Sequence, residues 1–170
     1  LAHEFQHMIH WYVGRNEITW LNEGFSELAS FLCGYDPGGF GWYFMKNPDR
    51  QLTYWPGGDE DSSANYGGSF LFVNYFYDRF GEEATKAWIS HEENGMESLD
   101  LVFEELGLAD GVSGELLTAD DFFMDWAVAN YLEIRELRMV VMGMKTIPLR
   151  QKHVKPRKFV IVPASGKNGW

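Results

Sequence analysis

The chain has 170 residues and a formal net charge of −11, and 45% of its residues are hydrophobic and 16% aromatic. A chain of this size can bury one sizeable core, so we expect a globular fold. The single cysteine, Cys33, excludes an internal disulfide, and its place at the end of an apolar helical pattern predicts a buried thiol. No apolar run is long enough to cross a bilayer, so no membrane span is predicted.

The first segment, LAHEFQHMIH, contains the pattern HExxH at His3, Glu4 and His7. If the segment is helical, residues four apart lie on one face, so the two imidazoles present ring nitrogens to a single point. Two such nitrogens supply half of a tetrahedral zinc site. Glu4 lies about 100° round the helix from His3, where its carboxylate can reach a metal-bound water without binding the metal. An amphipathic helix with two incidental histidines is the alternative interpretation.

A catalytic zinc usually takes three protein ligands, so the chain must supply one more. His10 continues the histidine stripe, but three ligands along one straight helix cannot converge on one ion, and a structural role is predicted for it. The extended metzincin pattern HExxHxxGxxH fails, because it needs glycine in place of His10 and histidine in place of Val13. The third ligand must therefore come from elsewhere.

Residues 19–30, TWLNEGFSELAS, predict a second helix, with Thr19 as N-cap and Gly34 as stop. The Gly-Arg-Asn break at residues 14–16 makes a short turn, so the two helices are expected to pack antiparallel.

On that helical hairpin, Glu23 sits where its carboxylate could cross to the metal. Asn22 and Glu27 could accept the free N–H groups of the two ligand imidazoles. An ordinary solvated helix face is the alternative for these residues.

The rest of the chain predicts a mainly α fold with little strand. Residues 34–63 are rich in glycine, proline and aromatic residues, which indicates a structured loop over the cleft. Four further helical patterns follow, at residues 62–80 with Ser63 near the cap and Gly81 as stop, 82–90, 97–106, and 118–133 with a capping pattern from Thr118 to Asp121. In the last of these helices, Trp126, Ala127, Val128 and Tyr131 are expected in the core.

Charge is distributed unevenly. Residues 1–136 hold 6 basic and 25 acidic side chains, a balance of −19, whereas residues 137–170 hold 8 basic and no acidic ones, a balance of +8. We therefore predict a main domain over residues 1–136 and a basic C-terminal extension over residues 137–170. Residues 158–163, KFVIVP, are typical of a short strand that could begin a further small domain. Nucleic-acid binding is not predicted, because the basic segment has few aromatic residues and no binding motif.

HEFQH followed by WLNEG resembles the gluzincin zinc peptidases, in which the third zinc ligand is a glutamate in an NEG context on the next helix. The similarity is greatest to the hyicolysin-like bacterial metallopeptidases, through AHEFQHMIHW, TWLNEGFSELAS, NYGGSFLFVNYFYDRFG and ADDFFMDWAVANYLE. The resemblance implies that His3, His7 and Glu23 bind Zn²⁺, that Glu4 is the general base, and that the enzyme is secreted. Since substrate-binding strands precede the zinc helix in gluzincins, we expect this chain to be a piece of a longer precursor.

The oxyanion formed during hydrolysis needs a donor besides zinc, and Tyr66, His91 and His153 are available. Tyr66 in ANYGGSF resembles the Tyr-x-x-Gly element that supplies the donor in gluzincin aminopeptidases, although here glycine falls early, at Gly67 and Gly68. Packing in the core is the alternative for Tyr66. His91 is the alternative donor, since thermolysin-like enzymes use a histidine in this role.

The predicted function is zinc-dependent hydrolysis of a peptide or protein substrate. Zinc would lower the pKa of a water and polarise the scissile carbonyl, while Glu4 would take the proton and pass it to the leaving amine. An endopeptidase is expected; a zinc aminopeptidase would need an anchor for the substrate's free amine. A non-catalytic binding or structural module is the remaining alternative, but it has no use for Glu4. The sequence does not indicate an oligomeric state.

Overall fold

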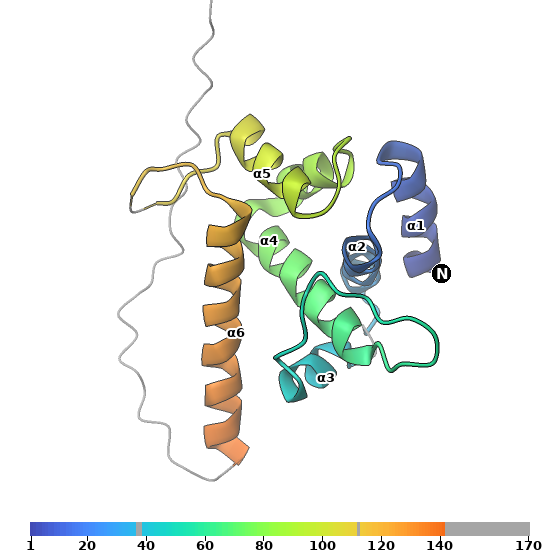
Figure 1. The fold of residues 1–170 in the computed structure, drawn as a ribbon, viewed down its shortest axis with the longest axis vertical. Helices are drawn as coiled ribbons and strands as arrows, with labels where there is room; N and C mark the ends of the chain where they lie inside the picture. Colours follow the sequence, from blue (N-terminus) through green and yellow to red (C-terminus); the bar gives the residue numbers. More distant parts are fainter. Residues whose placement is uncertain (37–38, 112, 142–170) are drawn as a thin grey trace, which may run out of the picture. The chain divides into compact units, whose positions relative to one another are not determined.

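Helices form nearly all the regular structure of the computed structural model, which describes residues 1–36, 39–111 and 113–141. The helices are α1 (Ala2–Val13), α2 (Thr19–Leu32), α3 (Phe40–Lys46), α4 (Ser63–Ile89), α5 (Gly95–Leu106) and α6 (Ala119–Val141) (Figure 1). Within the described residues, β pairing is limited to an isolated bridge between Ala109 and Leu116. The predicted mainly α class is confirmed.

The chain divides into two compact units, Leu1–Ser98 and Leu99–Trp170, with the division inside α5. The domain boundary predicted at Glu136 falls within α6. The predicted strand at residues 158–163 and the candidate His153 lie outside the described residues. No helix in the part of the chain that the structure describes is long and apolar enough to span a membrane.

The first two helices cross steeply, and the prediction that they pack antiparallel is wrong. In Figure 1, α1 is seen from the side while α2 is viewed nearly end-on. The connecting residues 14–18 include Asn16 in the left-handed conformation, with φ of 68°, which redirects the chain between the helices. Thr19 is also not the N-cap: it is the first residue of α2, and Ile18 precedes it as the cap.

The turn between α1 and α2 is fixed by Glu17. Its Oε1 accepts hydrogen bonds from the backbone N–H of Ile18 at 2.7 Å and of Gly95 at 2.9 Å. Burial raises the pKa of this carboxyl group, and the two N–H donors oppose the rise. The turn is thereby tied to Gly95, the first residue of α5.

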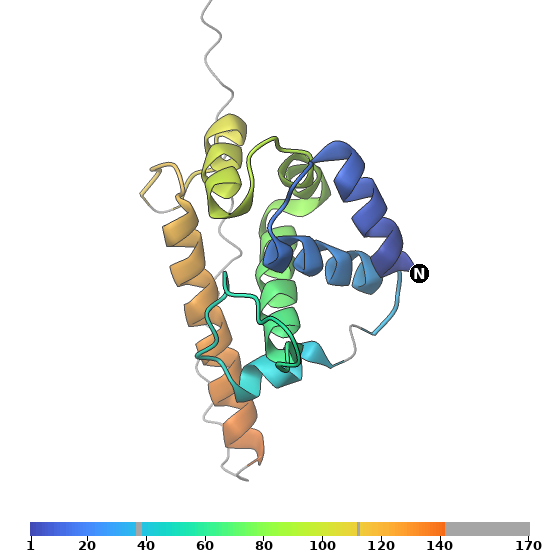
Figure 2. The same cartoon turned by 45° about the vertical axis from the view of Figure 1, so that its right-hand side comes forward.

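The core of the first unit lies between α2 and α4, and Figure 2 shows α2 between α1 and α4. Trp20 packs edge-on against Phe72 with ring centroids 5.8 Å apart, and Phe25 against Trp88 at 5.0 Å. The backbones approach closely at Gly24, where a Cβ would lie 2.9 Å from the carbonyl oxygen of Ser69. This close packing holds α2, and with it Glu23, at a fixed position.

α4 contains the helix stop that the sequence predicts. Gly81 has φ of 81° and ψ of −176°, so the helical residues before and after it form two stretches joined at a kink. The predicted cap of α6 is also present: Asp121 N–H donates to Thr118 Oγ1 at 3.1 Å, and Thr118 Oγ1 donates to Asp121 Oδ2 at 2.7 Å.

α3 was not predicted, and it occupies part of the expected loop. It packs on α4 at Gly67, where a Cβ would lie 2.0 Å from the carbonyl oxygen of Phe40, and Phe44 is buried beside it. Gly67 is therefore required for the backbone of α3 to approach α4.

The amphipathic pattern of α1 is the reverse of that of an ordinary surface helix, because its polar side is buried and its apolar side is exposed. Its buried residues are the polar Gln6 and His10, whereas Phe5, Met8 and Tyr12 are exposed. The polar face of α1 instead lies against α2.

Three predicted burials are wrong. Cys33 is exposed, because it caps the C-terminus of α2 rather than facing the core. Val128 and Tyr131 are also exposed, while Trp126 is buried as predicted. The apolar stripe of α6 is therefore narrower than its sequence suggests.

Gly67→Ala should lower stability, because the added methyl group meets a backbone carbonyl that can retreat only if α3 moves. We expect a net loss of about 1–3 kcal/mol in chemical or thermal unfolding. Gly41→Ala is the matched control, since its Cβ would meet only Leu71, at an ordinary 3.8 Å. Equal stability of the two variants would contradict this account of α3.

Candidate metal centre

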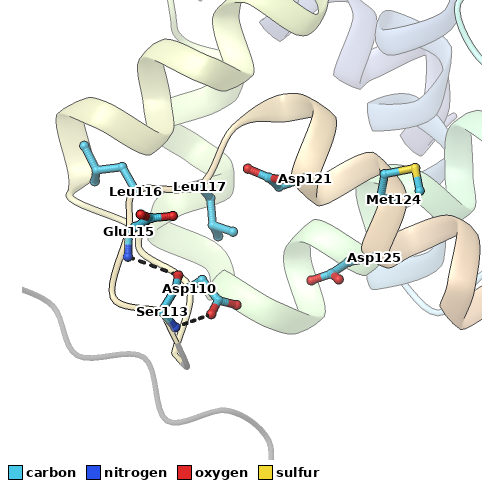
Figure 3. Close-up of a pocket in the computed structure, with 8 residues that line it drawn as sticks. All are labelled: Asp110, Ser113, Glu115, Leu116, Leu117, Asp121, Met124 and Asp125. Carbon is cyan, nitrogen blue, oxygen red and sulfur yellow. Dashed lines mark hydrogen bonds between the residues drawn. The ribbon is translucent and has the colours of Figure 1, made fainter.

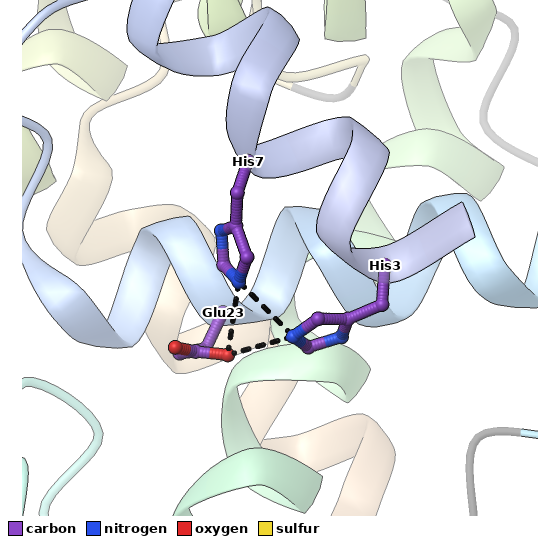
Figure 4. A group of neighbouring side chains, drawn as sticks. All are labelled: His3, His7 and Glu23. Atoms are coloured by element: carbon purple, nitrogen blue, oxygen red, sulfur yellow. Dashed lines mark hydrogen bonds and ion pairs between the residues drawn. The ribbon is translucent and has the colours of Figure 1, made fainter. Parts of the chain in front are cut away.

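Three ligand atoms converge where the polar faces of α1 and α2 meet. His3 Nε2 and His7 Nε2 lie 3.0 Å apart, and Glu23 Oε2 lies 3.2 Å from His3 Nε2 and 3.6 Å from His7 Nε2 (Figure 4). The two histidines come from successive turns of α1, and the glutamate comes from the second turn of α2. The structure thus brings together the three residues that the sequence analysis predicted as metal ligands.

The separations suit a small tetrahedral ion. Ligand atoms about 2.0–2.2 Å from such an ion lie roughly 3.3–3.6 Å from one another. The three observed distances, 3.0–3.6 Å, are close to that edge length. Among the residues that the structure describes, this is the one group of three or more histidine, cysteine or acidic residues whose ligand atoms converge in this way.

The other ring nitrogens face hydrogen-bond acceptors. His7 Nδ1 lies 3.0 Å from Asn22 Oδ1, and His3 Nδ1 lies 2.9 Å from Glu27 Oε1. These acceptors favour the proton on each Nδ1, which leaves each Nε2 with a lone pair toward the common point. Burial raises the pKa of Glu27, and the neighbouring His3 opposes the rise. Asn22 and Glu27 lie where the sequence analysis expected outer partners of the imidazoles.

Glu23 Oε2 is buried and has no hydrogen-bond donor within the described residues. With both imidazole protons held on Nδ1, three lone-pair atoms face one another without a donor between them. Such an arrangement is unfavourable unless a cation or a proton is shared. Two neutral imidazoles and one carboxylate are a donor set that could hold Zn²⁺.

Glu4 and Tyr66 lie beside this group. Glu4 follows His3 on α1 and is exposed. The Tyr66 ring lies 6.4 Å from the His3 ring, stacks on Phe40 at 4.9 Å and meets Trp55 edge-on at 4.9 Å. The hydroxyl is therefore fixed by aromatic packing at the edge of the group.

The Tyr66 hydroxyl remains protonated. Burial raises its pKa to about 12, and the negative charges of Glu23, Glu27 and Glu4 add to the rise. It is therefore a hydrogen-bond donor at neutral pH.

The two other histidines that the structure describes are His10 in α1 and His91 after α4, and their surroundings differ from those of His3 and His7. His10 is buried against Phe25 with ring centroids 5.6 Å apart, and burial lowers its pKa to about 4, so it is a neutral packing residue. His91 accepts a hydrogen bond from the N–H of Glu93, and its carbonyl lies against Gly14, at the opposite end of α1 from His3. The structure therefore brings Tyr66, and not His91, next to the ligand group.

Sequence analysis did not identify Ser26 and Gln6. Ser26 Oγ lies 3.0 Å from His7 Nδ1 and 2.5 Å from Gln6 Oε1. Ser26 follows Asn22 by one helical turn, so it shares the face that carries Asn22 and Glu23. That spacing is the one signal that could have revealed it.

An acidic hollow of about 230 Å³ lies within the second unit (Figure 3). Its carboxylates belong to Asp110, Glu115, Asp121 and Asp125. Asp110 Oδ1 accepts a hydrogen bond from the N–H of Ser113 at 2.8 Å. The carboxylates do not form a convergent ligand group like that of His3, His7 and Glu23. A cluster of acidic side chains alone does not make a site.

No family model, curated protein or solved structure matches the chain. The gluzincin resemblance stays a prediction from the motifs HEFQH and WLNEG.

Proposed function

We propose that the chain is a zinc-dependent endopeptidase of the gluzincin type. The observation that supports it most strongly is the convergence of His3, His7 and Glu23 with an acceptor behind each imidazole. A zinc site that only stabilises a fold needs neither an adjacent carboxylate nor a nearby phenol. Here Glu4 and Tyr66 supply both.

The proposed ligands are accessible from one side. The side chains of His3 and His7 are 21% and 24% exposed, and that of Glu23 is 17% exposed. Catalytic zinc sites keep one position for water or substrate, whereas structural sites are closed by four protein ligands. Three protein ligands and partial exposure suit the catalytic kind.

Each residue has a distinct role in the proposed reaction. His3, His7 and Glu23 would hold Zn²⁺, which supplies Lewis-acid polarisation of the carbonyl and a water of lowered pKa. Glu4 accepts the proton of the attacking water and returns it to the leaving amine. The Tyr66 hydroxyl donates a hydrogen bond to the oxygen on which negative charge develops. Asn22 and Glu27 hold the imidazole tautomers and ring orientations.

The purified chain should bind one zinc ion, measured by titration of the metal-free protein against a chromogenic chelator. His7→Ala or Glu23→Ala should reduce the affinity by more than the roughly 10–100-fold that loss of an outer partner causes. His91→Ala is the matched control. It should bind zinc like the wild type, because His91 lies beside Gly14, at the end of α1 opposite to His3. Equal affinities of all three variants would contradict the ligand assignment.

Glu4→Gln should abolish hydrolysis while keeping the metal. The amide has nearly the shape of the carboxylate but cannot take a proton, so turnover of a protein substrate should fall by about 10²–10⁴-fold. Zinc content should match that of the wild type. If Glu4→Gln lost both zinc and activity, Glu4 would be a ligand and not a base. Cleavage of intact protein, compared with a single amino-acid anilide, separates an endopeptidase from an aminopeptidase.

Tyr66→Phe should lower kcat by on the order of a hundredfold, because it removes one donor to the oxyanion. The phenylalanine ring keeps the packing against Phe40 and Trp55, so fold and zinc content should not change. Unchanged turnover in Tyr66→Phe together with a large loss in His91→Ala would assign the donor role to the histidine instead.

A further inference from the structure

Ser26 contacts His7 on the side of the ring that faces away from Glu23. Its side chain is fully buried, and its hydroxyl has three polar neighbours: Gln6 Oε1 at 2.5 Å, the carbonyl oxygen of Asn22 at 3.0 Å and His7 Nδ1 at 3.0 Å. Gln6 is itself buried. The hydroxyl thus connects α1 and α2 inside the molecule.

The hydroxyl has one proton and two lone pairs. Its proton is donated to Gln6 Oε1 or to the carbonyl of Asn22, since both are acceptors. A lone pair is then left for His7 Nδ1. The same holds if the Gln6 amide is turned, because the Asn22 carbonyl still takes the hydroxyl proton. Ser26 therefore presents an acceptor to His7.

Two acceptors, Ser26 Oγ and Asn22 Oδ1, consequently meet at His7 Nδ1, each at 3.0 Å. Neither carries a charge. His3 has a different partner, the carboxylate of Glu27 at 2.9 Å. A charged acceptor orients an imidazole more strongly than a neutral one, so His7 gains more from a second acceptor than His3 would.

We propose that Ser26 is a positioning residue that fixes the tautomer and ring orientation of His7 for metal binding. The inference rests on the proposed function, because it assigns a role at the same metal site. Gln6 supports it by holding the hydroxyl from α1. A serine that merely bonds to the carbonyl four residues back in its own helix would need neither Gln6 nor His7 within reach.

The experiment compares zinc affinity in three variants of the full chain, each first shown to be folded by circular dichroism. Ser26→Ala should bind zinc about tenfold more weakly, at the lower end of the range for loss of an outer partner. Ser26→Thr keeps the hydroxyl and should retain the wild-type affinity. Ser69→Ala is the matched control: Ser69 is also a fully buried helical serine, but its hydroxyl has no hydrogen-bond partner within the described residues.

A second measurement begins with the wild type. In the zinc-loaded wild type, ¹H–¹⁵N spectra of the histidine rings should show His7 protonated at Nδ1, with that proton exchanging slowly with water. Exchange should be faster in Ser26→Ala and unchanged in Ser69→Ala. A His7 ring without a proton on Nδ1 would overturn the inference even if Ser26→Ala did not fold.

The outcomes separate this inference from the proposed function. Equal zinc affinities of the wild type and Ser26→Ala would overturn the positioning role and leave the peptidase proposal standing. If Ser26→Ala bound zinc more weakly than the wild type, and the wild type had no hydrolytic activity, the positioning role would be supported and the peptidase proposal overturned. A wild type that does not bind zinc would overturn both.

Discussion

The convergence of three side-chain atoms between α1 and α2 is the constraint on which the rest of the site depends. His3 Nε2, His7 Nε2 and Glu23 Oε2 lie within 3.6 Å of one another, and Glu23 Oε2 has no donor within the described residues. The acceptors behind the two rings impose this arrangement, because they favour the proton on each Nδ1 and leave both Nε2 lone pairs facing the carboxylate. A cation bound by His3, His7 and Glu23 would pair with these lone pairs. Under the proposed function, metal binding and the stability of the helix crossing are therefore expected to be linked.

That crossing can be held only if α2 is itself immobile. One side of α2 carries the polar residues of the candidate metal centre, and the other is packed against α4 through Trp20, Phe25 and the close approach at Gly24. The same helix α4 begins with the segment that carries Tyr66. A single packed element thus sets the positions of both the carboxylate ligand and the phenol, which limits how far either can drift.

Local patterns were enough to predict most helices and the proximity of His3, His7 and Glu23. The i,i+4 spacing of His3 and His7 and the glycine stop at Gly81 depend on a few neighbouring residues only. Tertiary packing therefore does not change them. Features set by tertiary packing were missed. The short α3 depends on a contact with Gly67, the steep helix crossing depends on Asn16 in the turn, and the role of Ser26 depends on a partner nineteen positions earlier in the chain.

In α1, the exposed apolar residues lie on one side and the candidate metal ligands on the other, so that one set can be changed without the other. Phe5, Met8 and Tyr12 are exposed, whereas Gln6 and His10 of the same helix are buried. Polar replacements on this outer row would reduce apolar surface without altering the metal ligands. The exposed apolar surface of α1 can therefore be changed at positions other than those of the candidate ligands His3 and His7.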